Sequence, residues 1–225
     1  MAGGREGGGR VVVPTAAPQK ISWLGDAVMH SWFEPRSFGR PWAAERVQER
    51  WTCTGHAEST RVVEDLVRRE MAALGLPRDR IFLAGFSQGA ALALTTGLRI
   101  SAQEDAPLGG ILVFSGYLPQ YSPHSHDHEL CKTGQGQGAP GWAAAAVRTP
   151  VVFFHGDADP IVPRDWAEEA KGDLEAAGAQ VDLHVFSMRH ELCAPELLLA
   201  RRWVREQLAV DEPVADGGKG AEERA

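Results

Sequence analysis

One stretch of the chain, residues 80–98, restricts the fold more than any other. It reads RIFLAGFSQGAALALTTGL: an apolar run of strand type, then Gly-Phe-Ser-Gln-Gly, then an Ala- and Leu-rich run of helical type. In a parallel sheet, a strand that turns directly into a helix presents the turn residue at the carboxyl edge, where α/β proteins hold their functional groups. Ser87 is that residue. The stretch therefore predicts an α/β fold with a reactive serine at the edge of its sheet.

The two glycines of this turn, which we call the elbow (residues 85–89), have a steric reason. A serine on so sharp a turn adopts a strained backbone conformation, which presses together the residues two before and two after it. Gly85 and Gly89 occupy those positions and carry no side chain that could collide. The following helix directs its first N–H groups toward the space beside the serine hydroxyl. We expect Ser87 to be a nucleophile and the N–H of Gln88 to be an oxyanion donor.

Segments of strand type and helix type alternate along the rest of the chain. A short β-branched run at residues 10–13 ends at prolines, whereas residues 19–51 show no clear period. An amphipathic helix, which Ser59 or Thr60 can cap, ends near Gly75 and leads into the strand of the elbow. Further strands are expected at 110–115, 150–155 and 181–186, and further helices at 165–177 and 195–208. This alternation predicts a doubly wound, mainly parallel sheet.

Composition sets the domain organisation and the class of partner. A chain of 225 residues, 44% of them hydrophobic, suits one domain with a single core. We expect a flexible Gly-rich amino terminus at residues 1–10, the folded domain at 11–210 and a disordered acidic tail at 211–225. The formal net charge of −7 argues against nucleic acid or an anionic membrane surface as a partner. Three widely spaced cysteines, with no run that suits a signal peptide or a membrane span, predict a cytoplasmic protein without disulfides.

The base and the acid that a nucleophilic serine needs follow later strands. A serine hydroxyl is a weak nucleophile near neutral pH, so it requires an adjacent base that a carboxylate orients. His190 follows the last expected strand and is the candidate base, whereas His184 and His155 are expected to be structural. Asp159 is the candidate acid because it lies further out along its loop than the alternative, Asp157. Asp157 would then hold that loop through backbone N–H groups.

Three histidines and a cysteine within residues 120–147 form a pattern that zinc sites also use. They are His124, His126, His128 and Cys131. They alternate within a polar, Gly-rich excursion, and no second ligand cluster accompanies them. We therefore expect a solvated insertion here, and neither a metal nor a cofactor for this chain.

Large aromatic side chains gather in the irregular segment before the first helix. They are Trp23, Trp32, Phe33, Trp42 and Trp51. Such a segment can cover a pocket, or its aromatic side chains can fill the edge of the core. Trp32 and Phe33 are the two that we expect nearest a substrate.

Several motifs, in order along the chain, resemble those of one family. RIFLAGFSQGAALAL, FSGYLP, HGDADPIVP and MRHELC follow one another, and upstream VVVPTAAP and Met-His-Ser-Trp-Phe-Glu agree with the same pattern. On these residues the chain resembles the acyl-protein thioesterase, lysophospholipase and carboxylesterase family. The resemblance implies the α/β-hydrolase fold, with Ser87 as nucleophile, Asp159 as acid and His190 as base.

The resemblance also implies a substrate site and a reaction. Tyr117 and Leu118 occupy the place of an acyl-pocket wall, Ile161 lies close by, and Phe86 is also expected to face the substrate. The implied reaction is the hydrolysis of long-chain acyl thioesters on protein cysteines, which is protein S-depalmitoylation, without a cofactor. Lysophospholipids and small esters are the alternative substrates. A weak homodimer is left open.

One unit of the family has no counterpart in this sequence. The family opens with a strand that ends in His-Gly-Leu-Gly-Asp, followed by a helix, and this unit supplies the second oxyanion N–H. Trp23-Leu24-Gly25-Asp26 echoes that turn, but it falls at a different place in the order of motifs. We therefore expect a sheet truncated at the amino end. A third hypothesis follows, in which the chain is a weakened or inactive relative that binds lipid or protein.

Overall fold

The computed structural model describes residues 9–34, 55–103, 107–119 and 148–209. Several expected features lie outside these residues: most of the Gly-rich amino terminus, the acidic tail, the insertion with His124, His126, His128 and Cys131, and the aromatic residues Trp42 and Trp51.

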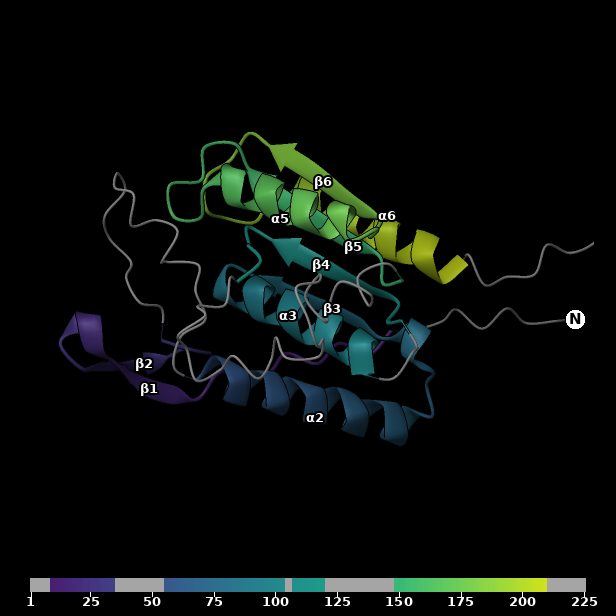
Figure 1. Ribbon diagram of the computed structural model, residues 1–225, viewed down its shortest axis with the longest axis horizontal. Helices are drawn as coiled ribbons and strands as arrows, with labels where there is room; N and C mark the ends of the chain where they lie inside the picture. The colour runs from purple at the N-terminus through teal and green to yellow at the C-terminus, as the bar shows by residue number, and fades with distance from the viewer. Residues whose placement is uncertain (1–8, 35–54, 104–106, 120–147, 210–225) are drawn as a thin grey trace, which may run out of the picture.

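A parallel sheet of four strands forms the centre of the described fold (Figure 1). Its order is β3 (Phe82–Phe86), β4 (Gly110–Phe114), β5 (Val151–Gly156) and β6 (Val181–Phe186). Every residue of β4 and β5 is buried, which explains why both read as continuous apolar runs rather than alternating patterns. Because the strands are parallel, their carboxyl ends meet at one edge. The expected α/β fold and its strands are confirmed.

Helices cover both faces of this sheet. They are α2 (His56–Leu74), α3 (Gln88–Gln103), α5 (Arg164–Ala176) and α6 (Ala194–Ala209). The side chains of α3 and α5 pack on one face of the strands, and those of α6 pack on the other. The helix α2 lies beside α3 (Figure 1).

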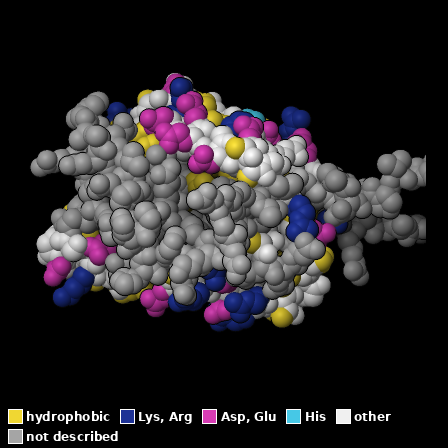
Figure 2. Space-filling model, viewed as in Figure 1, with side chains coloured by type: hydrophobic (Ala, Val, Ile, Leu, Met, Phe, Trp, Pro, Cys, Tyr) yellow, Lys and Arg dark blue, Asp and Glu magenta, His cyan; other side chains and the backbone are white. Residues whose placement is uncertain are grey.

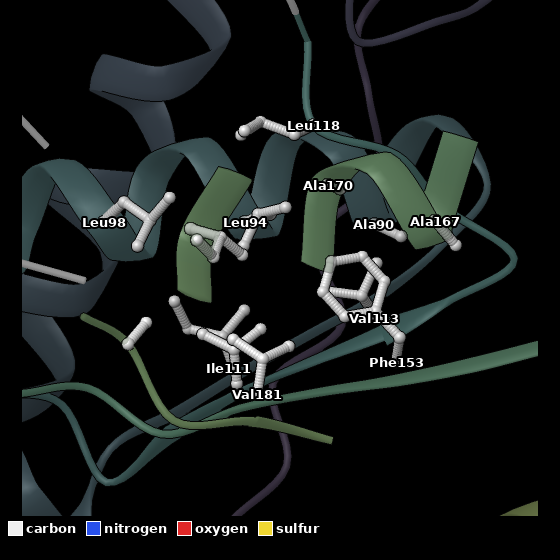
Figure 3. Packing of buried hydrophobic residues seen from close by; sticks show 13 residues of the cluster. Ala90, Leu94, Leu98, Ile111, Val113, Leu118, Phe153, Ala167, Ala170 and Val181 are labelled. Atoms are coloured by element: carbon white, nitrogen blue, oxygen red, sulfur yellow. The ribbon is translucent and has the colours of Figure 1, made fainter. Parts of the chain in front are cut away.

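Each face of the sheet has its own apolar core. Figure 3 shows the first, in which Leu94 and Leu98 of α3 lie above Ile111 of β4, together with side chains of α5. On the opposite face, Trp203 of α6 packs in a cluster with Phe154 of β5. The sheet is therefore covered on both sides, as a parallel sheet requires.

Small residues let α3 lie close to the sheet. Ala90 and Ala91 are fully buried, and a Cβ on Gly97 would come within 2.8 Å of Ile111 Cγ1. This close approach brings the second half of α3 near β4, while the buried alanines let its first turn lie close to the sheet.

The helix α2 begins earlier than its sequence signal indicates. Gly55, with φ of +91°, precedes its first residue, so the expected cap at Ser59 or Thr60 is wrong. Both residues lie inside the first turns. The expected end is confirmed, because Gly75 adopts φ of +62° and its N–H bonds to the carbonyl of Met71.

The amino-terminal region differs from the sequence-based expectation. Residues 11–13 form no strand, because no neighbouring strand pairs with them among the described residues. Instead, an antiparallel hairpin lies within the stretch expected to be irregular, formed by β1 (Pro18–Ile21) and β2 (Ala27–His30). Residues 23–26 belong to its turn, so they are not a strand–helix turn that could supply an oxyanion donor. In the described sheet, β3 is an outer strand.

Charged side chains of both signs are spread over the described part of the surface that Figure 2 shows. Within the described ranges, no helix is long and apolar enough to cross a membrane.

Candidate active site

Ser87 lies at the turn between β3 and α3 in a left-handed backbone conformation, with φ of 54°. Its N–H donates to the carbonyl of Phe114 at 2.9 Å, which ties the turn to β4. A Cβ on Gly85 would lie 2.6 Å from the backbone N of Ala90 and nearer still to the carbonyl of Gly89. A left-handed conformation is uncommon for residues other than glycine, so a serine here is held by its surroundings.

A hydrogen-bonded chain of three side chains starts at this serine. His190 Nε2 lies 2.9 Å from Ser87 Oγ, and His190 Nδ1 lies 2.7 Å from Asp159 Oδ2. Since a carboxylate only accepts, Nδ1–H donates to Asp159 and Nε2 is left free to accept the serine proton. The Asp159 side chain is fully buried and that of His190 is 15% exposed. The ring of Phe86 lies 4.7 Å from the His190 ring, between centroids.

His190 reaches Ser87 because its loop passes close over the end of β5. A Cβ on Gly156 would overlap the carbonyl oxygens of Met188 and Arg189 and lie 3.0 Å from Met188 C. The N–H of Ala158 donates to the Met188 carbonyl at 3.2 Å. We did not assign Gly156 from the sequence, although a glycine directly after the strand-ending His155 is a signal of such a close approach.

Asp159 holds its own loop as well as the histidine. Its Oδ1 accepts the N–H groups of Ile161 at 2.8 Å and Val162 at 2.9 Å. The sequence-based assignment of this turn-holding role to Asp157 is therefore wrong. Burial on its own raises the pKa of Asp159, but the hydrogen bonds from His190 and from the two N–H groups outweigh it and lower the pKa below its ordinary value. Asp159 is thus a carboxylate at neutral pH.

His155 supports the same loop, as its position at the end of β5 predicts. The ring is fully buried, and its Nε2–H donates to the Val162 carbonyl at 2.8 Å. Its Nδ1 is buried and has no hydrogen-bond partner among the described residues. Burial lowers the pKa of His155, so the ring is neutral near pH 7. A neutral ring 3.6 Å from Asp159 Oδ2 leaves that carboxylate to His190.

The oxyanion side of the serine is the start of α3. The carbonyl of Ser87 accepts the N–H groups of Ala90 and Ala91, at 3.0 and 3.1 Å. Gln88 is the first residue of the helix, where N–H groups have no acceptor within the helix. The expected role of this N–H as an oxyanion donor stays a prediction.

The residues expected to face a substrate lie at different depths. Phe33 is 2% exposed and its ring lies 5.0 Å from that of His56, whereas Trp32 is half-buried in the same apolar cluster. Tyr117 belongs to this cluster too and is buried. Leu118 belongs to the core under α3 and α5, and Ile161 is 47% exposed.

No group of three or more histidine, cysteine or acidic side chains suited to a metal ion occurs within residues 9–34, 55–103, 107–119 and 148–209. The four residues of the zinc-like pattern lie outside these ranges, so the expectation of a solvated insertion stays a prediction.

Known proteins are similar to this chain along most of its length. A family model described as Phospholipase/Carboxylesterase matches residues 9–207. Acyl-protein thioesterase 1 homolog 1 of Dictyostelium discoideum is 26% identical over 203 residues, covering 88% of this chain and 77% of that protein. Acyl-protein thioesterase 1 of Debaryomyces hansenii is 28% identical over 199 residues, with 88% and 75% covered. Among solved structures, Arabidopsis thaliana SOBER1 aligns with a TM-score of 0.69 at 23% identity, over 88% of this chain and 83% of that chain, and has the same fold.

Proposed function

The chain belongs to the phospholipase/carboxylesterase family of α/β-hydrolases, and from this premise we propose that it hydrolyses acyl thioesters of proteins through an acyl-Ser87 intermediate. The observation that carries the proposal is the hydrogen-bonded chain from Ser87 Oγ through His190 to Asp159. The names of the similar acyl-protein thioesterases support the choice of thioesters. The cysteine pattern supports a cytoplasmic location, where thiols stay reduced.

In the first half of the reaction, Ser87 Oγ attacks the thioester carbonyl while His190 Nε2 takes the hydroxyl proton. The new C–O bond places a negative charge on the carbonyl oxygen, which the N–H of Gln88 stabilises. The C–S bond then breaks, and the sulfur leaves with the proton from His190. Asp159 stabilises the positive charge on the ring throughout this step.

In the second half, water replaces the thiol. His190 takes a proton from the water, whose oxygen attacks the acyl carbon, and then returns the proton to Ser87 Oγ as the acyl C–O bond breaks. The products are the fatty acid and the free enzyme. Each proton passes through His190 Nε2, the ring atom 2.9 Å from Ser87 Oγ.

A fluorophosphonate probe tests the nucleophile. We expect labelling of the wild type and of Ser22→Ala, a control serine on the exposed hairpin turn, and no labelling of Ser87→Ala. Absence of labelling in folded wild-type protein, or equal labelling of Ser87→Ala, would refute the proposal.

A series of acyl chain lengths tests the substrate class. We expect kcat/KM to rise from acetyl to long-chain acyl thioesters. A fall beyond butyrate would instead identify a short-chain carboxylesterase. Labelling of Ser87 combined with a kcat about 100- to 1,000-fold below that of active relatives would indicate a missing oxyanion donor and support the weakened-relative hypothesis.

A further inference from the structure

The side chain of Gln88 has a structural role that its place in the elbow does not reveal. Its Oε1 accepts the N–H of Trp32 at 2.9 Å, and its Nε2 donates to the carbonyl of Phe33 at 2.8 Å. The Nε2 also donates to Ser31 Oγ at 3.0 Å, while Ser31 Oγ donates to the Phe33 carbonyl at 2.7 Å. The carboxamide thus uses both its acceptor and its donor on segment 31–33, more than fifty residues away in sequence.

Segment 31–33 lies outside the helices and strands. Its Ser31 N–H donates to the Ala17 carbonyl at 3.4 Å, and side chains from other elements provide further hydrogen bonds. Gln19 of β1 donates through Nε2 to the Ser31 carbonyl at 2.7 Å, and the hydroxyl of Ser59 on α2 donates to the Trp32 carbonyl. The side chain of Gln88 adds hydrogen bonds from α3. The segment is therefore fixed relative to the elbow through the residue next to the serine.

The two aromatic side chains of this segment belong to the same apolar cluster but differ in burial. Phe33 is anchored in the core, where it is 2% exposed. Trp32 is half-buried, and its indole Nε1 lies 3.9 Å from the position of a Cβ on Gly89, two residues after Ser87. The anchored Phe33 and the clamped Trp32 backbone together fix the point from which the indole extends beside the elbow.

We propose that the Gln88 side chain is a positioning residue, which holds the Trp32 indole beside Ser87 as a wall of the acyl site. The clamp itself is independent of the reaction, but its consequence for substrate choice rests on the proposed function. The carboxamide suits this role because it carries one donor and one acceptor end. A glutamate has no N–H to donate to the Phe33 carbonyl, and a methionine of similar length has neither the N–H donor nor the carbonyl acceptor.

Hydrogen exchange tests the clamp without any substrate. In Gln88→Met, we expect the Trp32 amide to exchange about tenfold faster, the factor that corresponds to one lost hydrogen bond. Gln180→Met, a change of the same type at an exposed position before β6, is the control and should leave the Trp32 amide unchanged. Amides of β5 should keep their protection in both variants. An unchanged exchange rate of the Trp32 amide in Gln88→Met would overturn the proposal.

Substrate selectivity tests the consequence. We expect Gln88→Met to lower the ratio of kcat/KM for an octanoyl ester to kcat/KM for an acetyl ester by about tenfold. This is about the discrimination that one methylene group in an apolar pocket provides. Trp32→Leu should lower the same ratio, and the double variant should lower it no further, because Gln88 acts through Trp32. Additive effects, or an unchanged ratio in Gln88→Met, would overturn the proposal.

Fluorophosphonate labelling of the wild type, together with hydrogen exchange, separates failure of this inference from failure of the proposed function. If the wild type takes no fluorophosphonate label, the proposed function fails, while exchange of the Trp32 amide still decides the clamp. If the wild type is labelled and the Gln88 variants behave as the Gln180 control does, the clamp fails and the hydrolase assignment stands.

Discussion

Replacement of Gly85 by alanine tests whether close backbone contact shapes the elbow. The added Cβ would lie 2.6 Å from the backbone N of Ala90 and nearer still to the Gly89 carbonyl. Both belong to the first turn of α3, which is buried against the sheet, so neither can rotate away as a flexible side chain could. The turn must open, and Ser87 Oγ must then move relative to His190.

The expected cost follows from that geometry. Overpacking of a protein interior costs about 1–3 kcal/mol and occasionally more. A collision with backbone places Gly85→Ala at the upper end, about 3 kcal/mol. For a domain of this size, each kcal/mol lowers Tm by about 2–4 °C, so we expect a fall of roughly 6–12 °C.

Gly172→Ala is the matched control. Gly172 lies inside α5, and a Cβ there has no atom within 4 Å. Alanine is the better helix former by about 0.5–1 kcal/mol, so this variant should be slightly more stable than the wild type. The same chemical change then has opposite signs at two positions, and only the surroundings differ.

Two measurements separate distortion from unfolding. Thermal denaturation gives the stability, and fluorophosphonate labelling at a temperature where both variants are fully folded gives the state of the elbow. We expect Gly85→Ala to be labelled far more slowly than Gly172→Ala. If Gly85→Ala melts within 2 °C of the wild type and is labelled at the wild-type rate, then the close contact between Gly85 and the start of α3 does not shape the elbow.

Three further predictions concern the carboxylate that orients His190, the stability of the fold at low pH, and an ion pair. Asp159→Asn should lower kcat by about 10⁴-fold, since an amide can hold His190 in the wrong tautomer, whereas a loss below tenfold in steady-state ester hydrolysis would contradict this. Burial lowers the pKa of His56 to about 4, so the unfolded chain binds that proton first and stability falls as pH drops through 6.5. Between pH 7.5 and 5 this costs about 2 kcal/mol, so in urea titrations the wild type should lose about 2 kcal/mol more stability than His56→Leu over this range. Glu64→Ala leaves the Arg99 guanidinium, now 2.5 Å from that carboxylate, without its partner between α2 and α3; we expect a loss of about 1–3 kcal/mol, and an unchanged Tm would show that the pair contributes nothing.

The parallel sheet was predictable because its strands carry signals in their own sequence. The fully buried strands β4 and β5 are continuous apolar runs, and each expected boundary lies close to the observed one. The elbow was predictable for the same reason, since its signal, a glycine two residues before and two residues after Ser87, lies within five consecutive residues. Where sequence and structure agree here, the deciding contacts lie within or next to one element.

The hairpin escaped prediction because its strands are short and lack alternation. All four residues of β2 are exposed, so no buried face imposes a pattern on them. The available signal was the Gly25-Asp26 pair in the turn, where both residues adopt positive φ. The clamp by Gln88 escaped for another reason: its partners lie more than fifty residues away, and no local pattern encodes such a contact.

The order of the strands explains why the site needs Gly156. Ser87 follows β3 and His190 follows β6, with β4 and β5 between them, so the histidine loop must span about 14 Å of sheet edge. It can do so only by crossing the end of β5, where Gly156 lets the backbone of Met188 pass closely. Asp159 leaves β5 at the same place, so its carboxylate meets the imidazole on the way to the serine. Asp159 therefore lies between Ser87 and His190 in the chain for a geometric reason: the strand that the His190 loop must cross is the one that can supply the partner of His190.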